Sequence, residues 1–495
     1  MKRCAGKVLA VLLLVLLFLP AAAPAAGQGT VKKTIGEWLT IGGDYRFRID
    51  SLRGEVPAFW NFLDPAYQGW LMGGMVGPPP PPTDAFKVKN DVLYTNRFGI
   101  DLHAKATRNV TVTARLLMYK SFGSQDDSAV SGLSTSAGLQ PFFADRVGVF
   151  DGTAGHIPGE GKLSVDVAYA TWKNLFGRPI WFSVGRRPST GGIPSHLRQN
   201  TRKPGNAGIP AILVDYAFDG MTLGWAPDIE ALPGAYAKIC YGRGFENGIT
   251  STTGNGLRDT DMIGVSLVPY DTDPLYLNVQ WNRGMNIFDF PVINSNTVFG
   301  STRPSTDLGD IDWFGLTLLS NLKNIGPGRL HLFGSGGLSI THPNDNLSNG
   351  MAGLLYSPSL EQKDDKTGWA AYVGARYDVN KERTKIGVEY NHGSEDWITF
   401  APAADDIWTS KLGTRGNVYE VYLIQEFSLE PISSYTSKTF FRIGYQYYDF
   451  DYTGSNNWVG SPVKIADLAN SPANAQMLIP MKNAQDLYGM LEVHF

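Results

Sequence analysis

Residues 185–204 concentrate side chains that can bind or steer ions. The stretch contains four arginines, one lysine and one histidine, and it has no acidic residue. Fixed positive charges inside a pore raise the local concentration of anions and can set its selectivity. Gly191 and Gly192, with Pro188 and Pro194, allow the backbone to turn tightly inward. We therefore predict a basic constriction in a water-filled passage, and the alternative is a solvated loop that binds lipopolysaccharide phosphates. The candidate constriction residues are Arg186, Arg187, His196, Arg198, Arg202 and Lys203.

Charged residues also recur at every second position within several short segments. In residues 44–50, acidic and basic side chains alternate with Tyr45, Phe47 and Ile49. Successive side chains of a strand point to opposite faces, so each such segment has a charged face and an apolar face. Because arginine facing lipid at mid-bilayer depth costs about 2–4 kcal/mol, the charged face is expected to line a lumen. The candidate lumen residues are Asp44, Arg46, Arg48, Arg97, Asp101, Arg115, Lys385 and Glu389.

Catalytic and metal-binding patterns are weak in this chain. His392 and Ser394 share a face at a strand end, but nucleophilic catalysis also needs a third group that orients the histidine, and the sequence fixes none. The cysteines are Cys4 and Cys240, and no haem-attachment or zinc-type cysteine motif is present. We predict a protein that is not an enzyme and has no cofactor. A lipid hydrolase using His392 and Ser394 is the less favoured alternative.

The elements that must position these residues are short strands. Alternating or β-rich segments between turn residues predict about sixteen of them. Their expected spans are 38–49, 92–104, 109–119, 163–173, 180–187, 212–224, 235–244, 261–269, 275–284, 311–320, 329–340, 369–378, 384–392, 418–428, 439–449 and 486–495.

The connections between these segments alternate in length. Short turns such as 269–274, 323–328 and 379–383 alternate with long stretches such as 120–162 and 450–485. This alternation is typical of an antiparallel up-and-down meander whose two ends face different compartments. The sequence thus predicts an all-β fold, a transmembrane β-barrel with long extracellular loops and short periplasmic turns. The stretch 120–162 is net acidic, and it is expected to face the basic stretch across the pore.

The two ends of the chain fit an exported protein. Residues 1–7 are basic, residues 8–19 are apolar and residues 21–26 are small, which is the pattern of a cleaved signal peptide. We assign residues 1–27 to this signal and residues 28–495 to the barrel. The last strand alternates up to Phe495, a terminus of the kind that the barrel-assembly machinery reads. The net charge of −3 does not favour nucleic acid as a partner.

The signal, the sequence Gly-Arg-Arg-Pro-Ser-Thr-Gly-Gly at 185–192 with His196 and Arg198, and the terminal Phe495 resemble an uncharacterised porin-like family of Gram-negative outer membranes. The resemblance implies a full-length barrel in the outer membrane, of a domain-of-unknown-function type. It supplies no substrate and no catalytic residue. The expected function is passive diffusion of small hydrophilic solutes, with anions slightly preferred.

The expected surroundings follow from this reading. Outer-membrane lipid, lipopolysaccharide and the barrel-assembly machinery are the predicted partners, and a homotrimer is one expected assembly. The alternative function is a barrel that sheathes a multihaem cytochrome for electron transfer, since such a sheath would also lack haem motifs of its own.

Overall fold

The computed structural model describes residues 35–125, 129–130, 156, 158–159, 161–249, 251, 257–289, 304–348, 350–379, 381–401, 405–427 and 438–495. The chain divides into two units, Met1–Leu39 and Thr40–Phe495, and each is considered by itself. The proposed signal peptide therefore lies outside the described residues. In the first unit, the described part contains the short helix α2 (Ile35–Trp38).

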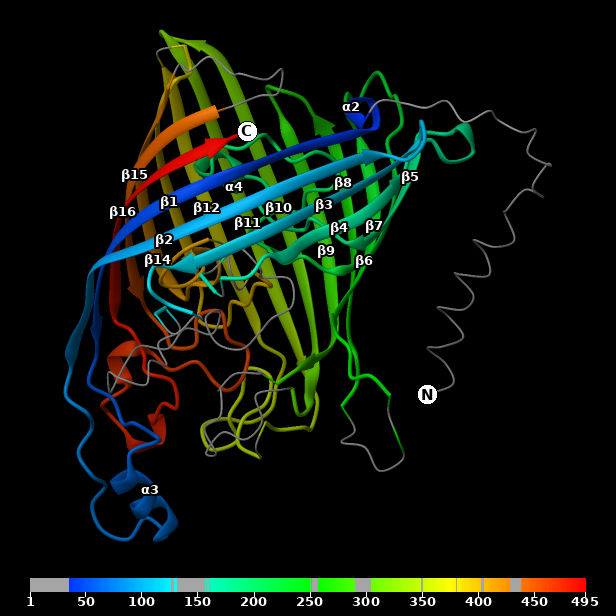
Figure 1. Ribbon diagram of the computed structural model, residues 1–495. Helices are drawn as coiled ribbons and strands as arrows, with labels where there is room; N and C mark the ends of the chain where they lie inside the picture. Colours follow the sequence, from blue (N-terminus) through cyan, green and yellow to red (C-terminus); the bar gives the residue numbers. More distant parts are fainter. Residues whose placement is uncertain are drawn as a thin grey trace. The chain divides into compact units, whose positions relative to one another are not determined.

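Sixteen antiparallel strands in the described residues form a closed barrel. Each strand pairs with the next one along the chain, and β16 returns to pair with β1 (Figure 1). The predicted up-and-down barrel is thus confirmed. The strands are β1 (Leu39–Val56), β2 (Phe86–Lys105), β3 (Val110–Ser121), β4 (Ser164–Trp172), β5 (Ile180–Arg186), β6 (Asp219–Trp225), β7 (Tyr236–Phe245), β8 (Thr260–Asp271), β9 (Tyr276–Phe288), β10 (Asp307–Ile325), β11 (Gly328–Pro343), β12 (Thr367–Val379), β13 (Thr384–Gly393), β14 (Gly416–Glu426), β15 (Lys438–Phe450) and β16 (Asn483–His494).

The seam between the first and last strands is fully hydrogen-bonded. The register runs from Asp44 opposite His494 to Glu55 opposite Asn483. At its end, Gly43 and Phe495 exchange two backbone hydrogen bonds of 2.9 and 3.0 Å. Closure removes the exposed strand edges that would otherwise leave backbone groups unpaired in lipid.

The connections segregate by length as expected. Residues 106–109, 272–275 and 326–327 are short turns, whereas residues 57–85, 187–218 and 451–482 are long connections. The first long connection carries α3 (Pro65–Met72), which begins at a proline and is capped by the side chain of Asp64. Other short helices in the described residues are α4 (Ser195–Arg198) and four 3-10 turns, η2 (Leu175–Gly177), η3 (Lys411–Gly413), η4 (Ile465–Asp467) and η5 (Pro472–Asn474). No described helix is both long and apolar enough to cross a membrane.

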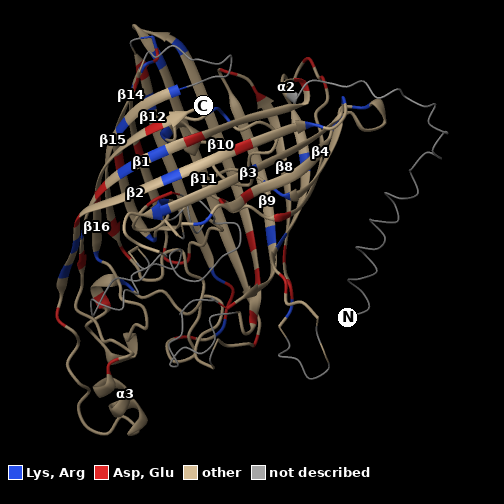
Figure 2. Ribbon diagram, viewed as in Figure 1, with Lys and Arg blue, Asp and Glu red and all other residues tan. Residues whose placement is uncertain are grey.

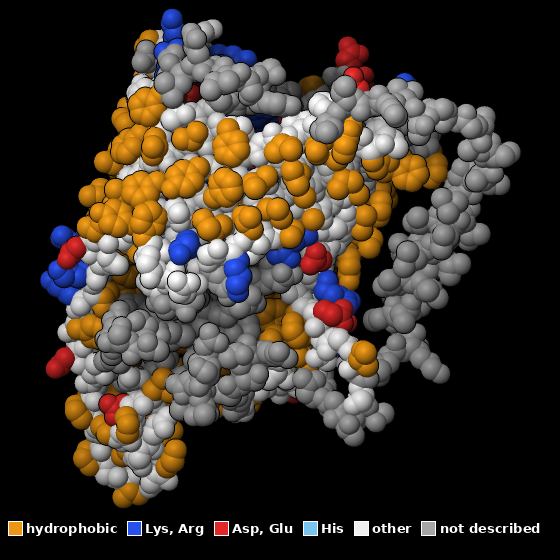
Figure 3. Space-filling model, in the orientation of Figure 1, with side chains coloured by type: hydrophobic (Ala, Val, Ile, Leu, Met, Phe, Trp, Pro, Cys, Tyr) orange, Lys and Arg blue, Asp and Glu red, His pale blue; other side chains and the backbone are white. Residues whose placement is uncertain are grey.

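The two faces of the barrel wall differ in chemistry. On β16, Leu487 and Leu491 are exposed on the outside, while Asp486 and Glu492 are buried on the inside. Figure 3 shows the outward side chains as a belt of hydrophobic groups, with charged groups gathered below it on the face in view. Acidic and basic positions recur along the strands of the wall (Figure 2). An apolar exterior around a polar interior is the arrangement of a transmembrane barrel.

Two long connections fold into the barrel. We call the described residues of 187–218 and 394–415 the plug. Ile212, Leu213, Trp397 and Phe400 of the plug are at most 2% exposed, and they share one hydrophobic core with Trp313 of the wall. Figure 1 places α4, which belongs to the plug, within the ring of strands.

The plug explains one difference between the predicted and observed strands. Residues 212–224 were expected to form one strand, but β6 begins at Asp219. Residues 212–218 are buried instead in the plug, where Val214 makes an isolated bridge to Phe400. A short apolar run has the same sequence pattern in a strand and in a buried irregular segment, so periodicity alone cannot distinguish the two.

Candidate functional site: the plug and the charged cavity

The plug rests on glycines of the inner wall. A Cβ atom on Gly315 would lie 2.6 Å from Leu213, and a Cβ atom on Gly337 would lie 2.6 Å from Trp397. Both distances are shorter than two carbon atoms can approach. These two positions on β10 and β11 therefore lack side chains at the places where the plug meets the wall.

Hydrogen bonds join the two halves of the plug to each other and to the wall. The backbone N–H of Phe400 donates to the carbonyl of Leu213 at 3.1 Å, and that of Asp215 donates to the carbonyl of Phe400 at 2.9 Å. The indole of Trp313 on β10 donates to the carbonyl of Ile398 at 2.8 Å. Buried backbone groups need such partners, so the plug is a built element of the fold and differs from a solvated loop.

A buried cluster of ion pairs fixes α4. The guanidinium of Arg198 lies 2.5 Å from Asp406 and 3.3 Å from Glu420 on β14. Lys411 lies 2.6 Å from the same Glu420 and also pairs with Glu389. Removing one partner of such a group leaves an uncompensated buried charge and costs about 3–5 kcal/mol.

A second set of ion pairs holds the plug against the seam. Arg46 on β1 lies 2.6 Å from Asp405 of the plug and 2.7 Å from Glu492 on β16. Arg48 on β1 pairs with Asp50 at 2.6 Å and with Asp486 at 2.8 Å. All of these side chains are buried, so water screens them little.

Between the plug and strands β2 to β4 lies a cavity of about 210 Å³, which we call the charged cavity. Its wall side carries Arg97, Arg115 and Asp166, and its plug side carries Asp405 and Gln199. Arg115 is held by Asp44, by Asp101 at 2.8 Å and by Asp166 at 3.4 Å. Guanidinium groups thus face a carboxylate across a polar space.

The predicted constriction residues lie in different places. Arg186 ends β5 and donates to the carbonyl of Asp166 at 3.1 Å, while Arg187 is buried and lies 5.6 Å from the ring centre of Tyr169. Arg202 is exposed. Lys203 pairs with Asp271 of β8, and its ammonium lies 4.6 Å from the ring centre of Tyr276. The structure brings His196 and Arg198 together on α4.

The electrostatics of α4 reduce the charge that the basic stretch presents. Burial, followed by the positive charge of Arg376, lowers the pKa of His196 to about 3. His196 is therefore neutral near pH 7. Arg198 stays charged, but two carboxylates neutralise it.

The candidate lumen residues lie on the strands as follows. Asp44, Arg46 and Arg48 are at most 4% exposed on β1, and Lys385 and Glu389 are buried on β13. Arg97 and Arg115 face the charged cavity, while Asp101 is exposed beside Arg115. The acidic stretch 120–162 falls largely outside the described residues.

Sequence reasoning did not select the charged plug residues that pair with these side chains and with Arg198. Asp405, Asp406 and Lys411 lie in a connection that also carries Trp397 and Phe400. Such large apolar residues in a long connection were the available signal, because a solvated loop has no reason to carry them.

The residues considered for catalysis have other partners. The Nδ1 of His392 lies 3.0 Å from the side-chain oxygen of Asn417, and the hydroxyl of Ser394 accepts a hydrogen bond from the backbone N–H of Trp369 at 2.9 Å. Among the described residues, no group of three or more His, Cys, Asp or Glu side chains could hold a metal ion.

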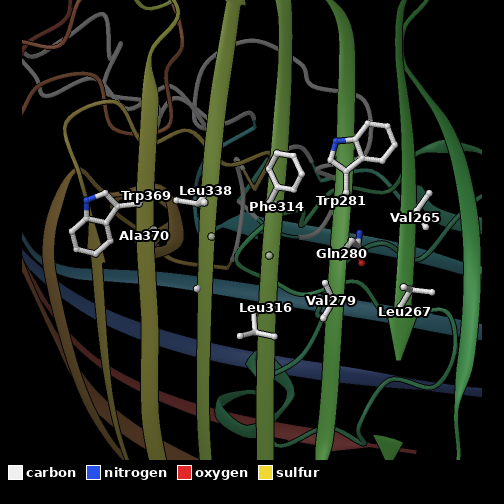
Figure 4. A pocket seen from close by; sticks show the side chains of 13 residues that line it. Val265, Leu267, Val279, Gln280, Trp281, Phe314, Leu316, Leu338, Trp369 and Ala370 are labelled. Carbon is white, nitrogen blue, oxygen red and sulfur yellow. The ribbon is translucent and has the colours of Figure 1, made fainter. Parts of the chain in front are cut away.

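A hollow of about 650 Å³ lies on the outer face of β8 to β12. Trp281, Phe314 and Trp369 stand around it (Figure 4), and its lining also includes the small residues Gly336 and Ala370. Phe314, Leu338 and Trp369 are among the outward side chains of the apolar belt. This hollow therefore belongs to the lipid-facing surface.

The closed meander, the apolar belt and the polar interior define a porin-like transmembrane β-barrel. A family model described as "Protein of unknown function (DUF3373)" matches residues 87–495. The chain belongs to this family. A search of curated proteins found no match.

Several solved outer-membrane proteins share a general likeness with this chain. OprB of Pseudomonas putida is 10% identical, with a TM-score of 0.42 over 93% of this chain and 95% of that chain. The anion-selective porin from Comamonas acidovorans is 10% identical, with a TM-score of 0.41 over 92% and 99%. OmpT, an outer membrane protein of Vibrio cholerae, is 13% identical, with a TM-score of 0.40 over 92% and 97%. The barrel of this chain is established by its own strand pairing.

Proposed function

We propose that this protein is an outer-membrane channel of the porin type, narrowed by its own plug, for the passive diffusion of small hydrophilic solutes. The observation that carries this proposal is the charged cavity between the plug and strands β2 to β4. A cavity lined by guanidinium, carboxylate and amide groups favours water and polar solutes over apolar ones. In the proposed orientation of the barrel in the outer membrane, the long connections face the cell exterior and the short turns face the periplasm.

The charge balance of the cavity supports weak ion selectivity. Arg97 and Arg115 face Asp166 and Asp405, and Asp44 binds both arginines from behind. His196 is neutral and Arg198 is neutralised by its partners, so α4 adds little to a preference for anions. The solutes that fit such a passage are small and polar, of either charge.

The plug also argues against the alternative function, in which the barrel sheathes a multihaem cytochrome for electron transfer. A sheath requires a free lumen through which a cytochrome can pass. The chain's own buried segments, including Trp397 and Phe400, occupy part of that space. This arrangement favours the channel.

The test is a single-channel recording of the purified protein in a planar bilayer under a salt gradient. We expect discrete conductance steps and a small reversal potential. Arg115→Gln should shift the reversal potential toward cations, because it removes a positive charge from the cavity. Arg108→Gln, in the exposed turn between β2 and β3, is the matched control and should leave the potential unchanged. A correctly folded barrel without conductance steps would overturn the proposal.

A further inference from the structure

The guanidinium of Arg187 lies in the barrel next to a second cavity, of about 30 Å³, at the start of the plug. Arg187 is 7% exposed, and its Nη1 atom has no hydrogen-bond partner in the structure. None of the ion pairs among the described residues includes this side chain. Its described neighbours are the thiol of Cys240 and the ring of Tyr169, 5.6 Å away, whose face attracts a cation only weakly.

A buried arginine cannot escape its charge by losing a proton. Burial lowers the pKa of Arg187, but from a value so high that the group stays positive at any physiological pH. Lys238, buried on β7, adds a second positive charge, and the charge of Arg187 acts on it. The ammonium of Lys238 donates to the carbonyls of Asn206 and Gly208, which are neutral groups. The positive charge in this part of the barrel is therefore not balanced by a carboxylate of the described residues.

A second orphan donor lines the same cavity. Asn282 on β9 is 3% exposed, and its side-chain oxygen accepts a hydrogen bond from the amide of Gln280 at 2.9 Å. The Nδ2 group of Asn282 is without a hydrogen-bond partner. Thr222 and Cys240 also line the cavity, and its described lining has no acidic residue.

From this geometry we infer that the cavity binds one small monovalent inorganic anion, of the size of chloride or bromide. Such an anion would accept hydrogen bonds from Arg187 and Asn282 and neutralise the guanidinium. Water fits a cavity of this size as well, because one molecule needs only about 10–15 Å³, but water carries no charge. The inference concerns a bound ion beside β6 to β9 and holds whether or not the barrel conducts.

The direct test is a crystal of the purified protein grown or soaked with sodium bromide. An anomalous difference peak within hydrogen-bonding distance of Arg187 is expected. Arg187→Gln should remove the peak, whereas Arg178→Gln, an exposed arginine in the turn between β4 and β5, should keep it. Density at this place that fits water, without an anomalous signal, would overturn the inference.

A solution measurement covers the case in which Arg187→Gln does not fold. The thermal midpoint of the wild type should be higher in sodium bromide than in sodium gluconate of equal ionic strength, because gluconate is too large for the cavity. Asn282→Asp adds a carboxylate to the cavity that Arg187 also lines and should make the midpoint equal in both salts. Equal midpoints in the wild type, or a bromide effect that persists in Asn282→Asp, would contradict the site.

Discussion

Asp405 illustrates how single residues hold the plug. Its carboxylate lies 2.6 Å from the guanidinium of Arg46. Burial would raise the pKa of Asp405, but the positive charges of Arg46 and Arg97 outweigh burial and hold that pKa below its usual value. A carboxyl group with a depressed folded-state pKa stabilises the fold fully above its unfolded pKa, near 4, and this contribution is lost only as the pH falls through the folded value.

Asp405→Asn imitates the protonated carboxyl group at every pH. We expect the substitution to lower the stability of the plug by about 3 kcal/mol. This value is at the lower end of the cost of breaking a buried ion pair, because Arg46 keeps Glu492 as a partner. Single-channel records at pH 7 should show frequent steps to a larger conductance. Asp345→Asn, on an exposed loop, should give the same single-channel record as the wild type at pH 7. The record of the wild type at pH 5 should also match its record at pH 7. An unchanged record for Asp405→Asn would show that this ion pair does not hold the plug.

A substitution of His196 tests whether the imidazole on α4 carries a charge in the channel. Since its pKa is about 3, the folded protein holds the imidazole neutral between pH 5 and pH 8. His196→Gln should therefore have the same reversal potential as the wild type at both pH values, measured under one salt gradient. A potential that changes with pH in the wild type and not in His196→Gln would mean that the imidazole titrates in the channel.

The residue scale also shows what the sequence could and could not predict. The inward face of β1, with Asp44, Arg46 and Arg48, followed from local alternation, because neighbouring side chains of a strand must point to opposite faces. The partners of Arg198 did not follow, since Asp406 and Glu420 lie more than two hundred positions away in the chain. Contacts of that kind depend on how the connections fold, which alternation does not encode.

At the scale of elements, the strands followed from local patterns and the packing of the plug did not. Each of the sixteen expected spans overlaps the observed strand of the same order, because each strand carries its own period-two pattern between turn residues. The expected span that starts at residue 212 begins seven residues before β6. There the apolar run Ile212–Val214 packs on the other half of the plug, a burial that no local pattern distinguishes from a strand.

The aromatic core of the plug predicts a local loss of stability. Phe400 is 2% exposed, and its ring centre lies 5.1 Å from that of Tyr216 and 5.3 Å from that of Phe218. Phe400→Ala should destabilise the plug by about 3–5 kcal/mol through lost burial and the cavity left behind. The midpoint of the urea-induced change in tryptophan fluorescence should fall. Phe427→Ala, at an exposed site after β14, should leave that midpoint in place, and equal midpoints for both variants would contradict the packing.

At the scale of the whole molecule, the barrel wall and the plug have separate roles. The wall closes its hydrogen bonds at the β1–β16 seam and presents an apolar belt to lipid. The plug fills part of the interior and leaves the charged cavity along β2 to β4. The central claim is that the plug limits the passage of solutes through an otherwise wide barrel.

Two adjacent glycines of β11 allow the most direct test of this claim. A side chain on Gly337 would collide with Trp397 of the plug, whereas a Cβ on Gly336 would have its nearest neighbour 4.0 Å away. Single-channel conductance should be measured for the wild type, Gly337→Val and Gly336→Val in the same bilayer and salt. The account predicts a small conductance for the wild type and Gly336→Val and a several-fold larger one for Gly337→Val. Equal conductance in all three folded proteins would contradict it.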